Sequence, residues 1–537
     1  MTAFIHLYDT TLRDGTQSQG VSFSKADKVR IAERLDAFGV SYIEGGWPGS
    51  NPKDMGFFEA MRGRSLAHAR LAAFGSTRRA AVTPEADANL QTLLQAETPV
   101  VTIFGKSWLF HVHDVLRVSP DENLDMVGSS CAFLRDHGRE VIFDAEHFFD
   151  GYADSPEYAL AVLRRAAAHG ASSVVLCDTN GGTLPDVLER VVREVAAALP
   201  GVALGIHCHN DTGCAVANSL AAVRAGAVQV QGTINGFGER CGNANLCTII
   251  PALVLKMGQP CLHQARLERL TEMSRFVYDL ANIGEDAHQP FVGSAAFAHK
   301  GGMHVNAVAK NAATFEHVAP EKVGNRRRIL VSDLAGGSNV LLKAEEHDIK
   351  LDSKGPEVRQ ILGELKRLES EGYEFESADA SFKVMVKKLM HDHESFFHLE
   401  GFRVIVEKRG PAEPCLSEAT IKIRVGDRTE ITAAEGDGPV NALDLALRKV
   451  LTDFYPKVRS MSLRDFKVRI LDGEDGTAAK TRVLIDSTDG RDSWGTVGVS
   501  GNIIEASWQA LLDSVEYYLF EQGVHPAVKG EKAGPKA

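Results

Sequence analysis

The first half of the chain alternates short apolar or β-branched runs with helix-like stretches, and this alternation repeats eight times. The predicted strands cover residues 5–8, 41–44, 70–74, 100–104, 140–143, 173–177, 203–207 and 228–231. The helices predicted to follow them include 25–38, 120–137, 156–169, 184–199 and 215–225. Eight such units in about 250 residues predict a (β/α)8 TIM barrel. A doubly wound open sheet is the alternative, but its first strand would more often precede a Gly-rich loop, and here that position reads "DTTLRDGTQ".

The pattern of predicted secondary structure changes twice after the barrel. At 537 residues it is too long for one ordinary core, so we expect an α/β protein of two or three domains. Gly-rich and polar segments follow the barrel, with amphipathic helices predicted at 355–368 and 377–390. The predicted domains are the barrel at 1–275, a connector with small helical subdomains at 276–393, an α+β domain at 394–525 and a disordered tail at 526–537.

The predicted α+β domain contains the order β-β-β-α twice. The runs "FRVIVEKRG", "ATIKIRV" and "RTEITAA" precede a helix at 440–451, and "DFKVRIL", "TRVLIDS" and "WGTVGVS" precede another at 503–520. This pseudo-repeat predicts one compact domain with two similar halves.

Composition and charge exclude several classes of partner. The formal net charge of −12 and the isoelectric point near 5.9 argue against a nucleic-acid or anionic-membrane surface. The first residues lack a signal-peptide pattern and no apolar run is long enough to span a bilayer, so we expect a cytoplasmic protein. The eight cysteines form no CxxC motif, which predicts reduced thiols.

The stretch "GIHCHNDTG" places two histidines, His207 and His209, at the end of the seventh predicted strand. Residues i and i+2 of a strand point to the same face, so both imidazoles can reach one cation. The alternative is a pair of polar residues at the end of a buried strand. With Asp14 and the amide oxygen of Asn243, they form a mixed oxygen and nitrogen set that suits Mn²⁺, Mg²⁺ or Zn²⁺. Asn243 could equally cap a loop, and Asp14 could form a surface ion pair with Arg13.

Three motifs in this order carry a family resemblance. "DTTLRDGTQ", "HCHND" and "GERCGNAN" resemble the metal-dependent aldol-condensing and lyase superfamily of isopropylmalate, homocitrate and citramalate synthases and hydroxymethylglutaryl-CoA lyase. "GDGPVNALDLAL" and "SWGTVGVSGNIIEASWQAL" resemble the C-terminal allosteric domain of the isopropylmalate and citramalate synthases. "AEHFFDGY", "VGNRRRILVSDLAGGSNV" and the length are most similar to the citramalate synthase branch.

The resemblance implies a condensation of acetyl-CoA with pyruvate, followed by thioester hydrolysis, to give citramalate and CoA for isoleucine biosynthesis. Metal ligation falls to Asp14, His207, His209 and Asn243. For catalysis it implies Arg13 as the residue that polarises the keto oxygen, and Glu146 and His304 as residues that handle the proton of the acetyl methyl group. Thr179, with Arg13, is implied to bind the 2-oxo acid. At His304 the alternative is a histidine in a Gly-rich turn.

The sequence departs from the family at two positions near His304. The family often has Asp two residues after this histidine and a tyrosine in the connector, whereas this chain has Asn306 and Phe315. If that phenol assists proton transfer in relatives, then water, His304 or another group must replace it here.

The C-terminal domain suggests a site for an effector. "AEGDGPVNA" places Gly436, Gly438 and Pro439 at the start of a helix, where free backbone N–H groups could bind a carboxylate. "VGVSGNI", with Val499, forms a similar turn in the second half. The alternative is a tight strand-to-helix turn without a ligand. The resemblance implies a homodimer whose interface binds an amino acid, with isoleucine as the expected effector.

Three other functions compete with this condensation. Isopropylmalate or homocitrate synthesis would use the same chemistry on a larger 2-oxo acid. Candidate residues lining the pocket for the side chain of the 2-oxo acid include Phe104 and Asp144. Retro-aldol cleavage is disfavoured because lyases usually lack the connector and the C-terminal domain. A catalytically idle sensor would require a broken metal set, and all four candidate ligands are present.

Overall fold

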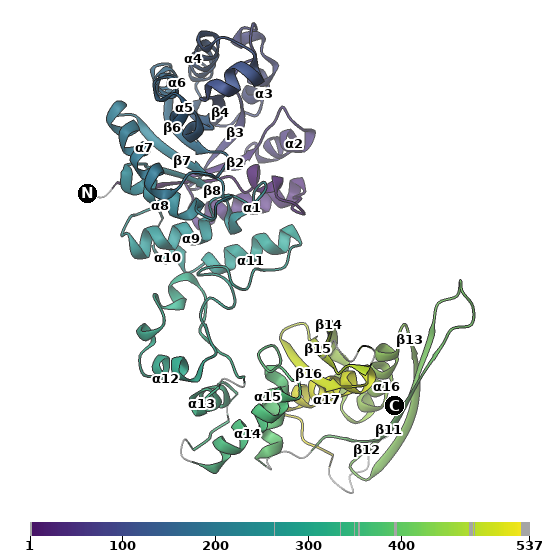
Figure 1. Ribbon diagram of the computed structural model, residues 1–537. Helices are drawn as coiled ribbons and strands as arrows, with labels where there is room; N and C mark the ends of the chain where they lie inside the picture. Colours follow the sequence, from purple (N-terminus) through teal and green to yellow (C-terminus); the bar gives the residue numbers. More distant parts are fainter. Residues whose placement is uncertain are drawn as a thin grey trace. The chain divides into compact units, whose positions relative to one another are not determined.

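The computed structural model describes residues 3–262, 264–332, 335–347, 349–352, 355–390, 395–471, 476 and 478–527. The chain forms two compact units (Figure 1). The first contains Met1–Phe297 and His317–Arg327, and the second contains Ala298–Glu316 and Arg328–Ala537. The predicted connector at 276–393 is therefore shared between the two units. Most of the predicted tail at 526–537 lies outside the described residues.

The first unit is a closed eight-stranded parallel barrel, which confirms the predicted fold and rules out the open sheet. The strands pair in sequence order, and β8 closes the barrel against β1, from His6 beside Gln229 to Asp9 beside Gly232. The strands are β1 (His6–Asp9), β2 (Tyr42–Gly46), β3 (Arg70–Ser76), β4 (Val100–Lys106), β5 (Glu140–Glu146), β6 (Ala171–Asp178), β7 (Ala203–Cys208) and β8 (Gln229–Gly232).

Helices surround the barrel (Figure 1). They are α1 (Lys25–Phe38), α2 (Pro52–Met61), α3 (Ala88–Gln95), α4 (Pro120–Asp136), α5 (Phe148–Asp154), α6 (Pro156–Ala168), α7 (Pro185–Ala198), α8 (Ala215–Ala225), α9 (Leu246–Pro251), α10 (Gln264–Leu267) and α11 (Leu270–Ala281). Local signals set their ends: Ser24 and Asp27 form a capping box at α1, and Gly39 ends that helix with a positive φ. Their apolar faces and the outer faces of the strands form one continuous core.

Several strands extend beyond their predicted C-terminal ends. β5 was predicted to end at residue 143 but continues to Glu146, and β4 continues from residue 104 to Lys106. The added residues include Lys106, Asp144 and Glu146, polar residues near the open end of the barrel, so the apolar pattern stops before the strand does. These extensions carry the side chains of the site described below.

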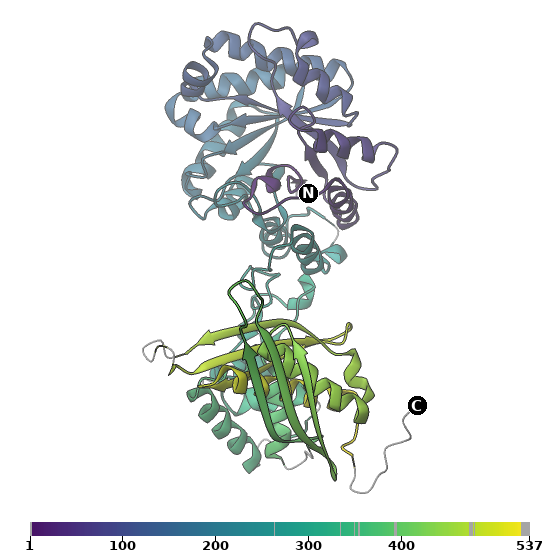
Figure 2. The same ribbon diagram turned by 90° about the vertical axis from the view of Figure 1, so that its right-hand side faces the viewer.

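The second unit contains the predicted pseudo-repeat. Two antiparallel three-stranded sheets, β11-β12-β13 and β14-β15-β16, are each followed by a helix that packs on its own sheet (Figure 2). The elements are β9 (Ala298–His299), α12 (Gly302–Lys310), β10 (Arg328–Ile329), α13 (Gly337–Glu346), α14 (Pro356–Ser370), α15 (Asp379–Leu389), β11 (His398–Glu407), β12 (Leu416–Val425), β13 (Arg428–Gly436), α16 (Pro439–Phe454), β14 (Ser462–Ile470), β15 (Thr481–Thr488), β16 (Ser493–Ser500) and α17 (Ile503–Glu521).

All eight cysteines are free thiols, as predicted. Across the described part of the chain, no helix combines the length and the apolar character needed to cross a membrane.

Candidate active site

A pocket of about 240 Å³ opens at the C-terminal ends of the barrel strands. This is the end at which TIM-barrel enzymes place their reactive groups. The residues that line it are Arg13, Asp14, Gln17, Trp47, Phe74, Phe104, Asp144, Glu146, Cys177, Thr179, His207, His209, Glu239 and Arg240.

Asp14 is held in the pocket by a tight turn after β1. The backbone N–H groups of Arg13 and Gly15 both donate to the carbonyl of Thr10, and Asp14 begins a short 3-10 helix. Asp9, the last residue of β1, accepts hydrogen bonds from the N–H and the hydroxyl of Thr11. The polar run "DTTLRDG" therefore folds back on itself and leaves the Asp14 side chain buried, at 2% exposure.

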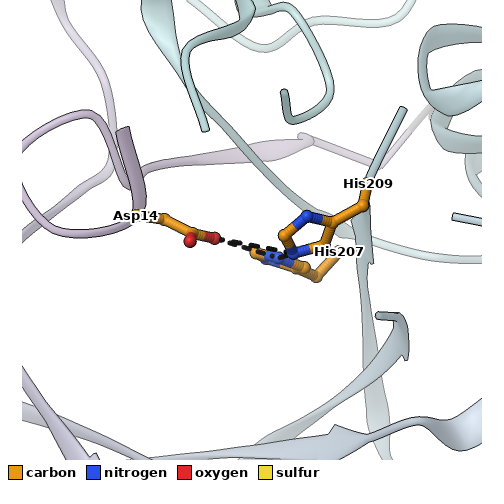
Figure 3. Close-up of side chains that lie close together, drawn as sticks. All are labelled: Asp14, His207 and His209. Atoms are coloured by element: carbon orange, nitrogen blue, oxygen red, sulfur yellow. Dashed lines mark hydrogen bonds and ion pairs between the residues drawn. The ribbon is translucent and has the colours of Figure 1, made fainter. Parts of the chain in front are cut away.

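His207 and His209 point to the same side, as the strand geometry predicts. Their Nε2 atoms lie 3.2 Å apart (Figure 3). The distance to Asp14 Oδ2 is 3.3 Å from His207 Nε2 and 3.9 Å from His209 Nε2. Both rings are buried. One candidate ligand atom from each of the three residues fits within 4.8 Å of the others, a spacing that a single cation can bridge.

Asn243 is brought to this cluster by a backbone link between two loops. His209 and Asn243 form an antiparallel bridge, and the N–H of Ala244 donates to the carbonyl of Cys208. Asn243 Nδ2 lies 2.7 Å from Asp14 Oδ2 and 3.5 Å from His207 Nε2, whereas its buried Oδ1 has no partner.

The orientation of the Asn243 amide determines whether this cluster fits a metal ion. The two ends of an asparagine amide are interchangeable in shape, so rotation by 180° places the orphaned oxygen beside Asp14 and His207. In that orientation the cluster consists of acceptor atoms alone: a carboxylate, two imidazole nitrogens and an amide oxygen. Acceptors that converge in a buried space require a cation, so these residues fit a divalent metal.

Charges in the pocket influence one another strongly. Burial opposes ionisation of Asp14, but the Arg13 guanidinium and both histidines outweigh it and hold the pKa of Asp14 well below its usual range. Burial opposes protonation of His207, yet contact with Asp14 raises its pKa. Burial and the neighbouring His207 lower the pKa of His209 to about 4. His209 is therefore neutral near pH 7, which is the form that binds metals.

Arg13 is fixed by Glu44, a residue that the sequence analysis missed. Arg13 Nε donates to Glu44 Oε1 at 2.5 Å, its guanidinium carbon lies 3.8 Å from the centre of the Phe74 ring, and Nη1 lies 3.3 Å from Asp14. Glu44 is fully buried and also accepts a hydrogen bond from Tyr8. A signal was present in the sequence: an acidic residue inside the otherwise apolar second strand, directly before Gly45 and Gly46.

Glu146 and Thr179 also line this pocket. Glu146 forms an ion pair with Lys106, a second residue that the sequence analysis missed because β4 extends beyond its apolar run. Thr179 Oγ1 accepts a hydrogen bond from the N–H of His147 at 2.9 Å. The hydroxyl proton of Thr179 is therefore free to be donated to a ligand.

His304 lies in the other compact unit, on α12. Its exposed ring stacks on Phe315, with ring centres 4.1 Å apart, and Asn306 is exposed on the same helix. The four predicted metal ligands, Arg13, Glu146 and Thr179 belong to the barrel unit. Six of the predicted residues thus line one pocket, Asn243 is buried against Asp14 beside it, and the eighth, His304, belongs to a separate unit.

The predicted effector residues lie in both halves of the C-terminal domain. Gly436 ends β13, Gly438 precedes α16 and Pro439 is its first residue, so these three form one strand-to-helix turn. Val499 lies in β16 of the second half, where its N–H donates to the side chain of Gln509.

Comparison with known proteins identifies the family of this chain. An HMGL-like family model matches residues 4–277, which are 274 of the 537 residues. The chain belongs to the HMGL-like family. This HMGL-like chain also matches a homocitrate synthase post-HMGL domain-like model over residues 291–373 and a LeuA allosteric (dimerisation) domain model over residues 376–519.

The HMGL-like chain is similar to curated enzymes over nearly its whole length. It is 57% identical to an (R)-citramalate synthase of Geobacter sulfurreducens, over 96% of this chain and 98% of the relative. It is 52% identical to an (R)-citramalate synthase of Aquifex aeolicus, over 98% and 100%. A probable 2-isopropylmalate synthase of Methanopyrus kandleri is 33% identical, over 95% and 97%. The predicted resemblance to this group of synthases is confirmed.

Proposed function

We propose that this chain is a citramalate synthase, which condenses acetyl-CoA with pyruvate and hydrolyses the thioester to release citramalate and CoA. The observation that carries the proposal is the convergence of Asp14, His207, His209 and Asn243 in one buried cluster beside Arg13. This arrangement occurs in a chain that is more than half identical to two (R)-citramalate synthases over nearly its full length.

The pocket supplies a separate group for each requirement of this reaction. A divalent metal held by Asp14, His207, His209 and Asn243 would bind a 2-oxo acid and make its ketone more electrophilic. Arg13 is held rigidly by Glu44 and Phe74, so its guanidinium stabilises the negative charge that develops on the keto oxygen. The free hydroxyl proton of Thr179 binds the substrate carboxylate.

Proton removal from the acetyl methyl group requires a base in the pocket wall. Glu146 meets this requirement, because Lys106 holds its carboxylate in place while leaving it 24% exposed. His304 is the second proposed proton-handling residue. Its exposed ring on α12 is accessible, and Phe315, which stacks on it, provides no hydroxyl of its own.

Aromatic side chains favour a small 2-oxo acid. Phe74 and Phe104 stack with ring centres 5.5 Å apart, and Trp47 packs edge-on against both. These three rings occupy one wall of a pocket of about 240 Å³, which leaves space for a methyl group more readily than for a branched side chain.

The C-terminal domain supports regulation by an amino acid. The LeuA allosteric (dimerisation) domain match supports a homodimer and a small-molecule effector, and a product of isoleucine biosynthesis is the natural candidate. We propose isoleucine as the inhibitor, bound near Gly436, Gly438 and Pro439 in one half and near Val499 in the other.

The test of the activity is CoA release from acetyl-CoA with Mn²⁺ or Mg²⁺, using pyruvate, 2-oxobutyrate, 2-oxoisovalerate and 2-oxoglutarate in turn. Preference for pyruvate is the expected result. Preference for a larger 2-oxo acid would retain the metal site and reassign the substrate, and no release with any acid would overturn the synthase assignment.

A further inference from the structure

A buried chain of hydrogen bonds runs from the candidate metal ligand His207 across the barrel interior to Asp144. His207 Nδ1 lies 2.8 Å from Gln231 Oε1, and Gln231 Nε2 donates to Asp144 Oδ1 at 3.1 Å. Exposure is 6% for His207, 0% for Gln231 and 3% for Asp144. All three residues lie on strands: His207 on β7, Gln231 on the adjacent β8, and Asp144 on β5 across the barrel.

The direction of these hydrogen bonds follows from the carboxylate. Gln231 Nε2 donates to Asp144 Oδ1, so the NH₂ end of the Gln231 amide faces the Asp144 carboxyl group. The oxygen end of the same amide then faces His207, and an oxygen in that position only accepts as well. His207 must therefore carry its proton on Nδ1, which leaves the lone pair on Nε2, the atom that faces Asp14 and His209.

We propose that Gln231 is a positioning residue that fixes the metal-binding tautomer of His207, and that Asp144 determines the orientation of Gln231. This proposal depends on the metal site of the proposed function and adds two residues to it, neither of which is a metal ligand. Asp144 also lines the substrate pocket, so one carboxylate contributes both to the pocket wall and to the orientation of a metal ligand.

Gln229 provides a matched control. It lies two residues before Gln231 on β8, so it points to the same face of the strand, and it is also buried, at 4% exposure. Its Oε1 atom has no hydrogen-bond partner. Each of the variants Gln229→Leu and Gln231→Leu therefore removes one buried amide from β8. Only Gln231→Leu removes the partner of His207.

The experiment measures Mn²⁺ affinity of the metal-free full-length protein by isothermal titration calorimetry. Gln231→Leu is expected to weaken Mn²⁺ binding by about 10- to 100-fold, the usual effect of removing the partner of a metal-bound histidine, whereas Gln229→Leu stays within about threefold of wild type. Thermal unfolding of each metal-free variant separates a loss of affinity from a loss of fold.

An exchange of the two side chains tests the direction. In the double variant Asp144→Asn with Gln231→Glu, the introduced carboxylate accepts from His207 Nδ1 and the introduced amide donates to it, so the same tautomer is retained. We expect this double variant to bind Mn²⁺ at least tenfold more tightly than Gln231→Leu.

The possible results separate the two proposals. Equal Mn²⁺ affinity of wild type and Gln231→Leu would overturn the positioning role while leaving the metal site intact, as would a folded double variant no better than Gln231→Leu. A wild-type protein that binds neither Mn²⁺ nor Mg²⁺ would overturn the metal site and the positioning role together.

Discussion

The end of the barrel and the turn before α16 both present polar groups where strands end, but they do so in opposite ways. In the barrel, buried polar side chains contact one another: Asp14 and Asn243 lie 2.7 Å apart and are each 2% exposed. At the turn, Gly436 and Gly438 offer backbone alone, and the N–H of Asp437 already donates to Asn441. The barrel site therefore depends on which side chains are present, and the turn depends on the path of the backbone.

This difference predicts how each region responds to substitution. Loss of one buried side chain in the barrel leaves other charged groups without partners, which is costly. A change at the turn alters only the space around the backbone.

The largest effect is expected for His209→Ala. Loss of one metal ligand should reduce CoA release by about a thousandfold, since Lewis-acid catalysis contributes several kcal/mol. His209 Nδ1 has no hydrogen-bond partner and Nε2 faces His207 and Asp14, so the metal-free variant should still fold, which circular dichroism would show. His113→Ala, at an exposed histidine of the barrel unit, is the control. Wild-type turnover by His209→Ala would contradict the role of His209 as a metal ligand.

A smaller loss is expected for Glu44→Gln. The substitution keeps the size of the side chain but removes the charge that fixes Arg13, so the guanidinium is free to move closer to Asp14. We expect kcat/KM to fall by about 100-fold, comparable to the loss of one preorganised donor to a developing oxyanion.

Steady-state kinetics with Arg13→Lys as a parallel variant would test this interpretation. If Glu44 acts through Arg13, adding Glu44→Gln to Arg13→Lys should cause little further loss. Fully additive losses in the double variant would show that Glu44 contributes independently of Arg13.

Phe104→Ala should change specificity more than rate. Removal of this ring enlarges the pocket beside Phe74, so the ratio of kcat/KM for 2-oxobutyrate to that for pyruvate should rise by about tenfold. Phe110→Ala is the matched control, because Phe110 is 50% exposed after the same strand and does not line the pocket. An unchanged ratio in Phe104→Ala would place the substrate side chain elsewhere in the pocket.

The smallest effect is expected at the turn. A Cβ at Gly436 would lie 2.5 Å from the backbone nitrogen of Ala442, so Gly436→Ala must shift the start of α16. We expect the isoleucine concentration for half-inhibition to rise by about fivefold. Gly401→Ala, in β11 of the same half with no atom within 4 Å of its Cβ, is the control. Equal responses from the two variants would argue against an effector at this turn.

The same contrast explains what could be predicted from sequence. The barrel was predictable because eight apolar runs at regular spacing mark its strands. The candidate ligands could be proposed from the sequence because carboxylate, imidazole and amide side chains are common metal ligands. Glu44, Lys106 and Gln231 were missed. Each lies on a strand whose apolar pattern it interrupts or extends, and the pairing of adjacent strands brings it beside its partner. The bridge between His209 and Asn243 joins two loops, and no local pattern specifies it.

The most direct measurement is pulsed electron paramagnetic resonance of Mn²⁺ bound to the full-length protein. We expect couplings from two imidazole nitrogens in wild type and from one in either His207→Ala or His209→Ala. Mn²⁺ bound without any nitrogen coupling would contradict the assignment of these histidines as metal ligands.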